Sequence, residues 1–248
     1  MCESSRHYEI VSHAELGDLA HQVYELASHC FAAYPGVLKP SEAHREWYVR
    51  RPGMSAELSS AALCDGQLVA NVFITCVEMR LGGQLLPVGL VDTVMTHPAH
   101  RQRGLARVAL SRAIAGMSAH GLAASALYTL LDGMPSRFYQ SLGYRLHAPV
   151  DYMTRTQPVT GRRAASLEAQ PLSAGDDAVL QDYLNAHFAE HDGYQPYDAA
   201  LWAWRKRQRP PTLPADHYAL WENGRPVAFA TLCHAVVIAP PGRAGIGD

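Results

Sequence analysis

Long apolar runs and a strong charge of either sign are both missing from this sequence. No stretch approaches the roughly 20 apolar residues that a membrane-spanning helix needs, and the first ten residues, MCESSRHYEI, lack the apolar core of a signal peptide. The formal net charge is only −2, which argues against a surface that binds nucleic acid. We therefore expect a cytoplasmic protein that binds neither a membrane nor nucleic acid.

Cysteine is scarce, and metal-binding patterns are missing. The five cysteines are widely spaced and form no Cys-x-x-Cys pair, so neither a disulfide framework nor a zinc site is indicated. The histidines are scattered, and the pair at His97 and His100 supplies only two ligands. We expect no metal.

The two common nucleotide-binding loops are absent as well. There is no Gly-x-Gly-x-x-Gly fingerprint, and no Gly-Lys-Ser/Thr follows the loop Arg101-Gln102-Arg103-Gly104-Leu105-Ala106. That loop instead lies between a predicted strand and a predicted helix. Helix N-termini present unpaired N–H groups and the positive end of a dipole, while Gly104 and Ala106 leave room for the phosphates. The loop predicts a pyrophosphate cradle, although arginines beside a glycine are also common at solvated helix starts.

Turn signals and hydrophobic periodicity predict a mixed α/β (α+β) sheet. Asp65-Gly66 is a strong hairpin signal, and Leu81-Gly82-Gly83-Gln84 predicts a second turn. Hairpin strands come first and a β-α-β unit follows, which differs from a doubly wound parallel sheet. The predicted strands are 7–11, 61–64, 68–77, 88–96, 122–130 and 144–150, and the predicted helices are 14–31, 41–50, 104–120 and 134–142.

Two motifs resemble those of a known family. The segment from Val91 to Ala106, VDTVMTHPAHRQRGLA, resembles the signature of the GNAT superfamily of N-acetyltransferases. The segment from Phe138 to Tyr144, FYQSLGY, resembles the Phe-Tyr-x-x-x-Gly-Phe/Tyr element of the same family. The resemblance covers about residues 5–155. It implies the GNAT acyl-CoA N-acyltransferase fold, with acetyl-CoA as the acyl donor.

The resemblance also implies which residues bind acetyl-CoA. The strand 88–96 is expected to splay from its neighbour at a bulge, so that the backbone of Val94, Met95 and Thr96 binds the pantetheine arm. These three residues are equally compatible with ordinary sheet core. The residues expected to hold the pyrophosphate are Arg101, Gln102, Arg103, Gly104, Leu105, Ala106 and Arg107.

The chemistry of amine acetylation calls for a base and an acid. An amine of pKa about 10.4 is almost entirely protonated at neutral pH, and a thiolate resembling CoA has a pKa of about 8.5. Tyr139 matches the tyrosine of the family element and is our candidate acid; the alternative is a packing tyrosine. Asp92, a charge in an apolar strand, is our candidate base, expected to share a strand face with Val94 and Thr96. A structural aspartate, bonded to backbone or arginine, is as good an interpretation.

Two further residues are less suited than Asp92 to act as the base. Glu78, on the preceding strand, is a weaker candidate than Asp92. His97 is better explained as a turn residue.

The pattern of the remaining residues predicts a partial second copy of the first domain. Helices are predicted at 178–188 and 198–207, and the hairpin around Asn223-Gly224 resembles the one around Asp65-Gly66, about 157 residues earlier. We predict a GNAT domain at 1–155, a linker at 156–163 and a partial GNAT-like segment at 164–248; a chance hairpin is the alternative. The tandem layout resembles enhanced-intracellular-survival (Eis) type enzymes. Residues 239–247 only faintly echo the phosphate loop, and the basic run 205–209 is interpreted as a solvated helix face.

Two functions remain open at this stage. The first is an N-acetyltransferase acting on a primary amine of a small molecule or on another amino acceptor. The second is a non-catalytic acyl-CoA-binding or sensing module, since fold alone cannot decide. The acceptor groove is expected around residues 31–50 and 131–135, and a contribution from the C-terminal segment is left open. Self-association into a homo-oligomer is left open.

Overall fold

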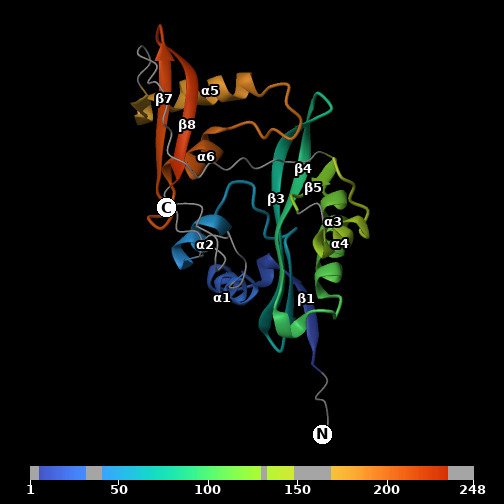
Figure 1. The fold of residues 1–248 in the computed structure, drawn as a ribbon. Coiled ribbons are helices and arrows are strands. Elements are labelled where there is room, and N and C mark those ends of the chain that lie inside the picture. Colours follow the sequence, from blue (N-terminus) through green and yellow to red (C-terminus); the bar gives the residue numbers. More distant parts are fainter. Residues whose placement is uncertain (1–5, 32–40, 130–132, 148–168, 234–248) are drawn as a thin grey trace. The chain divides into compact units, whose positions relative to one another are not determined.

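The computed structural model describes residues 6–31, 41–129, 133–147 and 169–233 (Figure 1). Its contacts divide the chain into two compact units. The first comprises Met1–Ala33, Gly53–Val77 and Leu86–Thr154, and the second comprises Tyr34–Pro52, Glu78–Leu85 and Arg155–Asp248. The predicted linker at 156–163 and the faint loop echo at 239–247 lie outside the described residues.

A five-stranded mixed sheet forms the framework of the first unit. The order is β1 (Tyr8–Ser12), β2 (Ser60–Cys64), β3 (Gln67–Leu81), β4 (Gln84–Thr96) and β5 (Ala124–Ala126). The pairs β1–β2 and β2–β3 are antiparallel, whereas β4–β5 is parallel. The predicted mixed α/β sheet is therefore confirmed.

Helices cover both faces of this sheet (Figure 1). Helix α1 (Leu19–Phe31) lies on one face, and α3 (Leu105–Ala119) and α4 (Met134–Gln140) lie on the other. Two short 3₁₀ turns, His13–Glu15 and Pro98–His100, complete the unit. No helix in the described part of the chain is both long and apolar enough to span a bilayer.

Helix α3 packs closely on β4, which places the start of the helix at the end of the strand. Its buried residues, Leu105, Ala109, Leu110, Ala113 and Met117, form one stripe along the helix. Gly89 of β4 permits the approach, because a Cβ there would overlap the Met117 sulfur. The geometry of the β4–α3 junction is thus set by core packing.

The predicted tight turns are confirmed. Both central residues have positive φ at Asp65-Gly66 (50° and 80°), Gly82-Gly83 (58° and 78°) and Asn223-Gly224 (51° and 73°). This is the conformation of the type I′ turns that favour Asn-Gly and Asp-Gly. The predicted helix at 41–50 is also present as α2 (Glu42–Val49) in the second unit, with the Ser41 hydroxyl accepting from the His44 amide.

The second unit contains a three-stranded antiparallel sheet. Its order is β6 (Gln170–Pro171), β7 (Ala215–Glu222) and β8 (Arg225–Cys233). Helix α5 (Asp177–His187) follows the 3₁₀ turn Ala174–Asp176, and α6 (Ala199–Trp202) runs directly into a π-helical segment, η4 (Ala203–Arg207). The core is formed by Leu180, Trp202 and Ala219.

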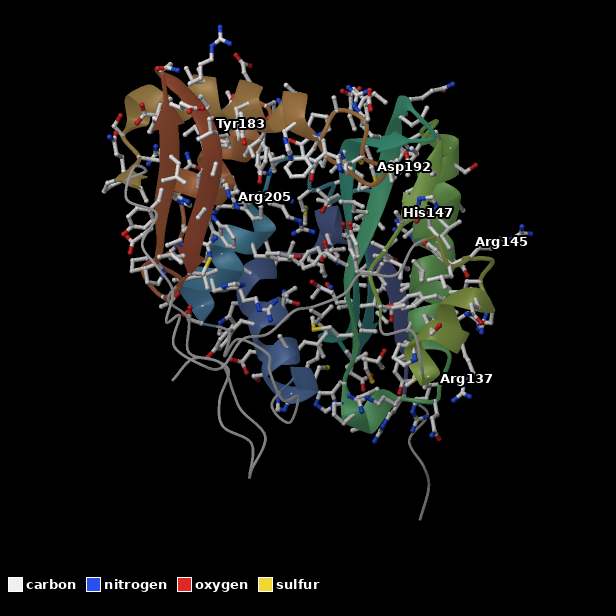
Figure 2. The ribbon with its side chains drawn as sticks, turned by 45° about the horizontal axis from the view of Figure 1, so that its top comes forward. Arg137, Arg145, His147, Tyr183, Asp192 and Arg205 are labelled. Atoms are coloured by element: carbon white, nitrogen blue, oxygen red, sulfur yellow. The ribbon has the colours of Figure 1, made fainter. Side chains whose placement is uncertain are left out.

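The basic run at 205–209 differs from the prediction of a solvated helix face. Arg205 donates to the Gln195 side chain, Arg207 pairs with Asp177, and Arg209 donates to the Leu213 carbonyl (Figure 2 labels Arg205). The neighbouring segments 171–177 and 195–213 supply these partners, and a helix-periodicity argument cannot see them. The run is part of the packing of the second unit.

Some predicted element boundaries are wrong, and one predicted strand does not form where its residues are described. The first helix begins at Leu19 rather than residue 14, because Ser12 and Glu15 close a capping box around a separate 3₁₀ turn. The strand predicted at 122–130 is only Ala124–Ala126. Residues 144–147 form no strand, and Arg145, Leu146 and His147 are exposed and bury no sheet face; residues 148–150 are outside the described part.

Candidate active site

The strand β4 is irregular at the position where the cofactor strand is expected to bulge. Thr93 has φ 48°, a left-handed conformation that is unusual for a β-branched residue. Val91 and Val94 are three residues apart, yet both pack against the same core cluster. Strict alternation would put them on opposite faces, so the register shifts at Thr93, as in a β-bulge. The predicted common face of Asp92, Val94 and Thr96 is wrong for the same reason.

Asn71 supports this irregular backbone, and sequence reasoning missed it. Its side chain is fully buried, at 0% exposure, and its amide nitrogen donates to the Thr93 carbonyl at 2.9 Å. Its Oδ1 atom is buried without a hydrogen-bond partner in the described structure. The available signal was one polar residue in the apolar run Leu68–Ile74, LVANVFI.

Beyond Leu90, β4 leaves its parallel neighbour. The ladder between the strands pairs Val88 with Ala124, Gly89 with Ser125 and Leu90 with Ala126. Within the described residues the pairing stops there, although β4 continues to Thr96. The backbone of Val94 and Met95 therefore lies past the part of β4 that pairs with β5.

The loop after β4 turns the chain into α3 with two left-handed residues, Gln102 (φ 60°) and Gly104 (φ 77°). A Cβ added to Gly104 would meet nothing within 4 Å, so the glycine serves the backbone conformation and leaves open space in front of it. The first helical bond inside α3 runs from the Val108 amide to the Gly104 carbonyl. The three preceding amides, of Leu105, Ala106 and Arg107, thus gather at the helix start, as in anion sites.

The loop side chains make contacts with other parts of the first unit. Arg101 Nε donates to the Thr96 carbonyl at 3.1 Å, and Arg103 lies 6.0 Å from the Tyr8 ring. Arg107 donates to Ser141 Oγ at 2.7 Å, and Leu105 is buried in the core. Leu105 and Arg107 therefore contribute only their backbone amides to the open start of α3.

Two histidines, His97 and His100, lie in the short turn that precedes the loop. His97 Nδ1 accepts from the Ala99 amide at 3.2 Å, so His97 caps the short turn, as its interpretation as a turn residue required. Burial lowers the pKa of His97, and His29 and Arg101 lower it further. Tyr8 OH and His100 Nδ1 are 3.0 Å apart. The described residues contain no group of three or more His, Cys, Asp or Glu arranged to hold a metal ion.

Tyr139 of α4 packs near the same strand. Its ring lies 5.2 Å from that of Phe138 and 6.0 Å from that of Tyr144, and Tyr139 and Val94 contact one core cluster. Burial, with a smaller effect of Tyr144, raises the pKa of Tyr139 to about 12. In the described part of the chain its hydroxyl makes no hydrogen bond, whereas the Tyr144 hydroxyl is 2.6 Å from Ser125 Oγ. Tyr139 is thus protonated at neutral pH and able to donate.

The candidate bases differ in their surroundings. Asp92 is half-buried and accepts from Thr93 Oγ1 at 2.7 Å, so its carboxylate is tied to the irregular part of β4. Glu78 is exposed and belongs to the second unit. Arg137 and Arg145, near α4, are exposed and point outward (Figure 2). The acceptor groove predicted at 31–50 and 131–135 falls largely outside the described residues or in the second unit.

Comparison with solved structures shows the same fold in other proteins. A GCN5-related N-acetyltransferase from Anabaena variabilis is 17% identical, with a TM-score of 0.65 over 92% of this chain and 54% of its own. An Enterococcus faecalis conserved protein of unknown function, described as a probable N-acyltransferase, is 14% identical, with a TM-score of 0.66 over 91% and 55%. Saccharomyces cerevisiae N-myristoyltransferase with bound myristoyl-CoA is 13% identical, with a TM-score of 0.65 over 95% and 59%.

The chain spans little more than half the length of these three proteins. None of the curated proteins matches it. The model of the acetyltransferase (GNAT) domain matches residues 16–147, more than half of the 248 residues and including β4, the loop, α3 and α4. The chain belongs to the GNAT acetyltransferase family.

Proposed function

We propose that this protein transfers the acetyl group of acetyl-CoA to a primary amine, of a small molecule or another amino acceptor, by direct attack. The observation that carries the proposal is the β4–α3 junction. A strand that breaks its alternation at Thr93 and leaves β5 after Leu90 runs into a loop ending at an open helix start. Family membership supports acyl transfer in general; the acetyl donor and the amine acceptor rest on the sequence motifs.

The cofactor would bind along this junction. The backbone of Val94, Met95 and Thr96 is proposed to receive the pantetheine arm, which extends as an extra strand beside β4. The Thr96 carbonyl already accepts from Arg101, so that bond must be shared or exchanged. The amides of the α3 start receive the pyrophosphate, with Arg101, Gln102 and Arg103 around it.

Tyr139 is proposed to stabilise the departing CoA thiolate. Its pKa is about 12, and that of the thiol is about 8.5. Complete proton transfer from tyrosine to sulfur is therefore uphill by roughly 5 kcal/mol, from about 3.5 pKa units at about 1.36 kcal/mol each. Tyr139 thus acts chiefly as a hydrogen-bond donor to the leaving sulfur. Asp92 is proposed to accept the amine proton through water, because its carboxylate belongs to the same irregular strand.

We also infer that the second segment, 164–248, is a partial copy of the first domain, 1–155, joined by the linker at 156–163. The order β6–β7–β8 repeats β1–β2–β3. Each first strand is followed by a capping box, Ser12 with Glu15 and Ser173 with Asp176. The two hairpins have register shifts at equivalent places, Ala62/Leu63 and Leu220/Trp221, two residues before each turn.

Two tryptophans extend this repeat. Trp47 of α2 and Trp204 of η4 stand 157 residues apart, stack at 4.3 Å, and each donates its indole N–H to the other's carbonyl. Reciprocal bonds between equivalent positions are what two related helices produce when they pack symmetrically. Such a tandem arrangement supports the resemblance to Eis-type enzymes. No second phosphate site is proposed.

Thiol release from acetyl-CoA with a panel of amines tests the function. Tyr139→Phe should lower turnover by about 100-fold and leave the affinity for acetyl-CoA nearly unchanged. Tyr128→Phe removes the same hydroxyl from a residue that is 72% exposed and is the matched control. Tight acetyl-CoA binding without turnover on any amine would instead identify a non-catalytic binding module. Equal turnover in both variants would remove Tyr139 from the mechanism.

A further inference from the structure

Lysine is nearly absent from this protein, and one of its two lysines is in an unusual place. Over the whole sequence lysine occurs only at positions 39 and 206. Lys206 belongs to η4, the π-helical segment Ala203–Arg207, and is half-buried in the second unit. Short π segments cost regular hydrogen bonding and often mark functional positions. Nothing in the proposed acetyltransferase site uses this residue.

Three aromatic rings surround the Lys206 ammonium. Its Nζ lies 4.9 Å from the ring centre of Phe229, 5.9 Å from that of Tyr197 and 6.0 Å from that of Trp202. The rings attract the cation but remove water from it. Burial, with smaller contributions from Arg205 and Arg209 and against an opposing effect of Cys233, lowers the pKa of Lys206 to about 8. Apolar surroundings and adjacent cations are the usual means of activating a lysine nucleophile.

A directed hydrogen-bond chain holds the amine. Lys206 Nζ donates to Thr231 Oγ1 at 3.2 Å, Thr231 Oγ1 is 3.0 Å from His217 Nδ1, and His217 Nε2 is 2.8 Å from the Lys206 carbonyl. A carbonyl only accepts, so Nε2 carries the proton and Nδ1 accepts from Thr231. Burial lowers the pKa of His217, which favours this neutral form. The chain fixes Nζ and provides a route for its proton.

We propose that Lys206 is a self-acetylation site, whose Nζ takes the acetyl group of acetyl-CoA. The proposal rests on the proposed function only for its donor. The neutral amine attacks the thioester carbonyl carbon, the N–C bond forms, and the C–S bond breaks with its electron pair leaving on sulfur. The amine proton passes through Thr231 and His217 or directly to water, and the thiolate takes up a proton. Counted from the neutral amine, the net products are N-acetyl-Lys206 and CoA in its thiol form.

The nucleophilicity of Lys206 is tested first without CoA. At pH 7 an amine of pKa about 8 is about 9% neutral, whereas one of about 10.5 is about 0.03% neutral. With a water-soluble N-hydroxysuccinimide ester of acetate, peptide mapping should show Lys206 labelled at least about tenfold faster than Lys39, with a rate midpoint near pH 8. Labelling of Lys206 no faster than Lys39, with a midpoint near 10.5, would overturn the proposal.

Acetyl-CoA is then used as the reagent on the full chain. Lys39→Arg leaves Lys206 as the only lysine, and its intact mass should rise by one acetyl group that maps to Lys206 and not to the N-terminal amine. Lys206→Arg should abolish that increment. Thr231→Val keeps the lysine and breaks its hydrogen bond, so labelling should slow, with far-UV circular dichroism checking that each variant is folded.

The outcomes separate this proposal from the proposed function. Labelling of Lys206 by the active ester but not by acetyl-CoA, while thiol release with amines persists, overturns self-acetylation alone. Loss of both reactions of acetyl-CoA, with active-ester labelling intact, overturns both proposals through their common donor. If acetyl-CoA still labels Lys206 in the Tyr139→Phe variant, with the same pH midpoint as labelling by the active ester, the lysine reacts directly with acetyl-CoA.

Discussion

Replacing Gly104 with alanine separates backbone strain at the start of α3 from the space in front of it. Gly104 has φ 77°, and an added Cβ would meet nothing in the protein within 4 Å. The cost to stability is therefore the left-handed conformation alone, about 1–2 kcal/mol for an L residue. If the pyrophosphate binds here, the new methyl group also occupies its space, and the affinity for acetyl-CoA should fall by about tenfold or more, about 1.4 kcal/mol.

Gly121→Ala is a matched control at the other end of the same helix. Gly121 has φ 74°, and its added Cβ also meets nothing within 4 Å, so both variants should lose a similar free energy of unfolding in urea. Only Gly104→Ala should weaken acetyl-CoA binding, measured by titration calorimetry or as the KM for acetyl-CoA. Equal affinities in the two variants would refute the cradle, and a large difference in stability would refute the strain argument.

Two further predictions concern β4 and the second unit. Asn71→Ala removes the donor to the Thr93 carbonyl in a part-buried position, so the free energy of unfolding should fall by about 1–3 kcal/mol, with weaker acetyl-CoA binding; an unchanged urea midpoint would contradict the support role. Although burial of Asp177 opposes it, the hydrogen bonds from Arg207 keep the pKa of that carboxyl below 3.8. A carboxyl group whose pKa is lower in the folded than in the unfolded state stabilises the fold at pH values above its unfolded pKa. That stabilisation is lost as the pH falls through the folded pKa. Asp177→Asn should therefore cost about 1 kcal/mol or less at pH 7, and this cost should shrink as the pH falls below 3.8, measured by urea unfolding.

Features set by neighbouring residues were predictable. The three two-residue turns depend on Asp-Gly, Gly-Gly and Asn-Gly pairs, and the Ser41 cap depends on an amide three residues away. The loop before α3 belongs with them, since Gly104 and the residues beside it specify a left-handed turn into a helix. The mixed sheet followed from the order of these local signals. The roles of Tyr139 and Asp92 stay predictions.

Elements that depend on distant partners were not predictable. The strand predicted at 122–130 contains only three residues in the structure, because β5 pairs with β4 only as far as Leu90. The basic run at 205–209 was predicted to be a solvated helix face, because its partners Gln195, Asp177 and Leu213 lie in other segments of the chain. Periodicity records which face of an element is apolar, but it does not record which polar partner meets a charged side chain.

The family, the order of the main elements and the position of the proposed phosphate loop could be predicted from the amino-acid sequence, because a motif and a tight turn are encoded within a few residues. The position at which β4 loses its alternation depends on the fold, since the carbonyl of the left-handed Thr93 accepts from Asn71, 22 residues earlier on a neighbouring strand. The fold likewise places Lys206 among aromatic rings. Strain at one residue and desolvation of one amine both depend on side chains that folding brings from elsewhere in the chain.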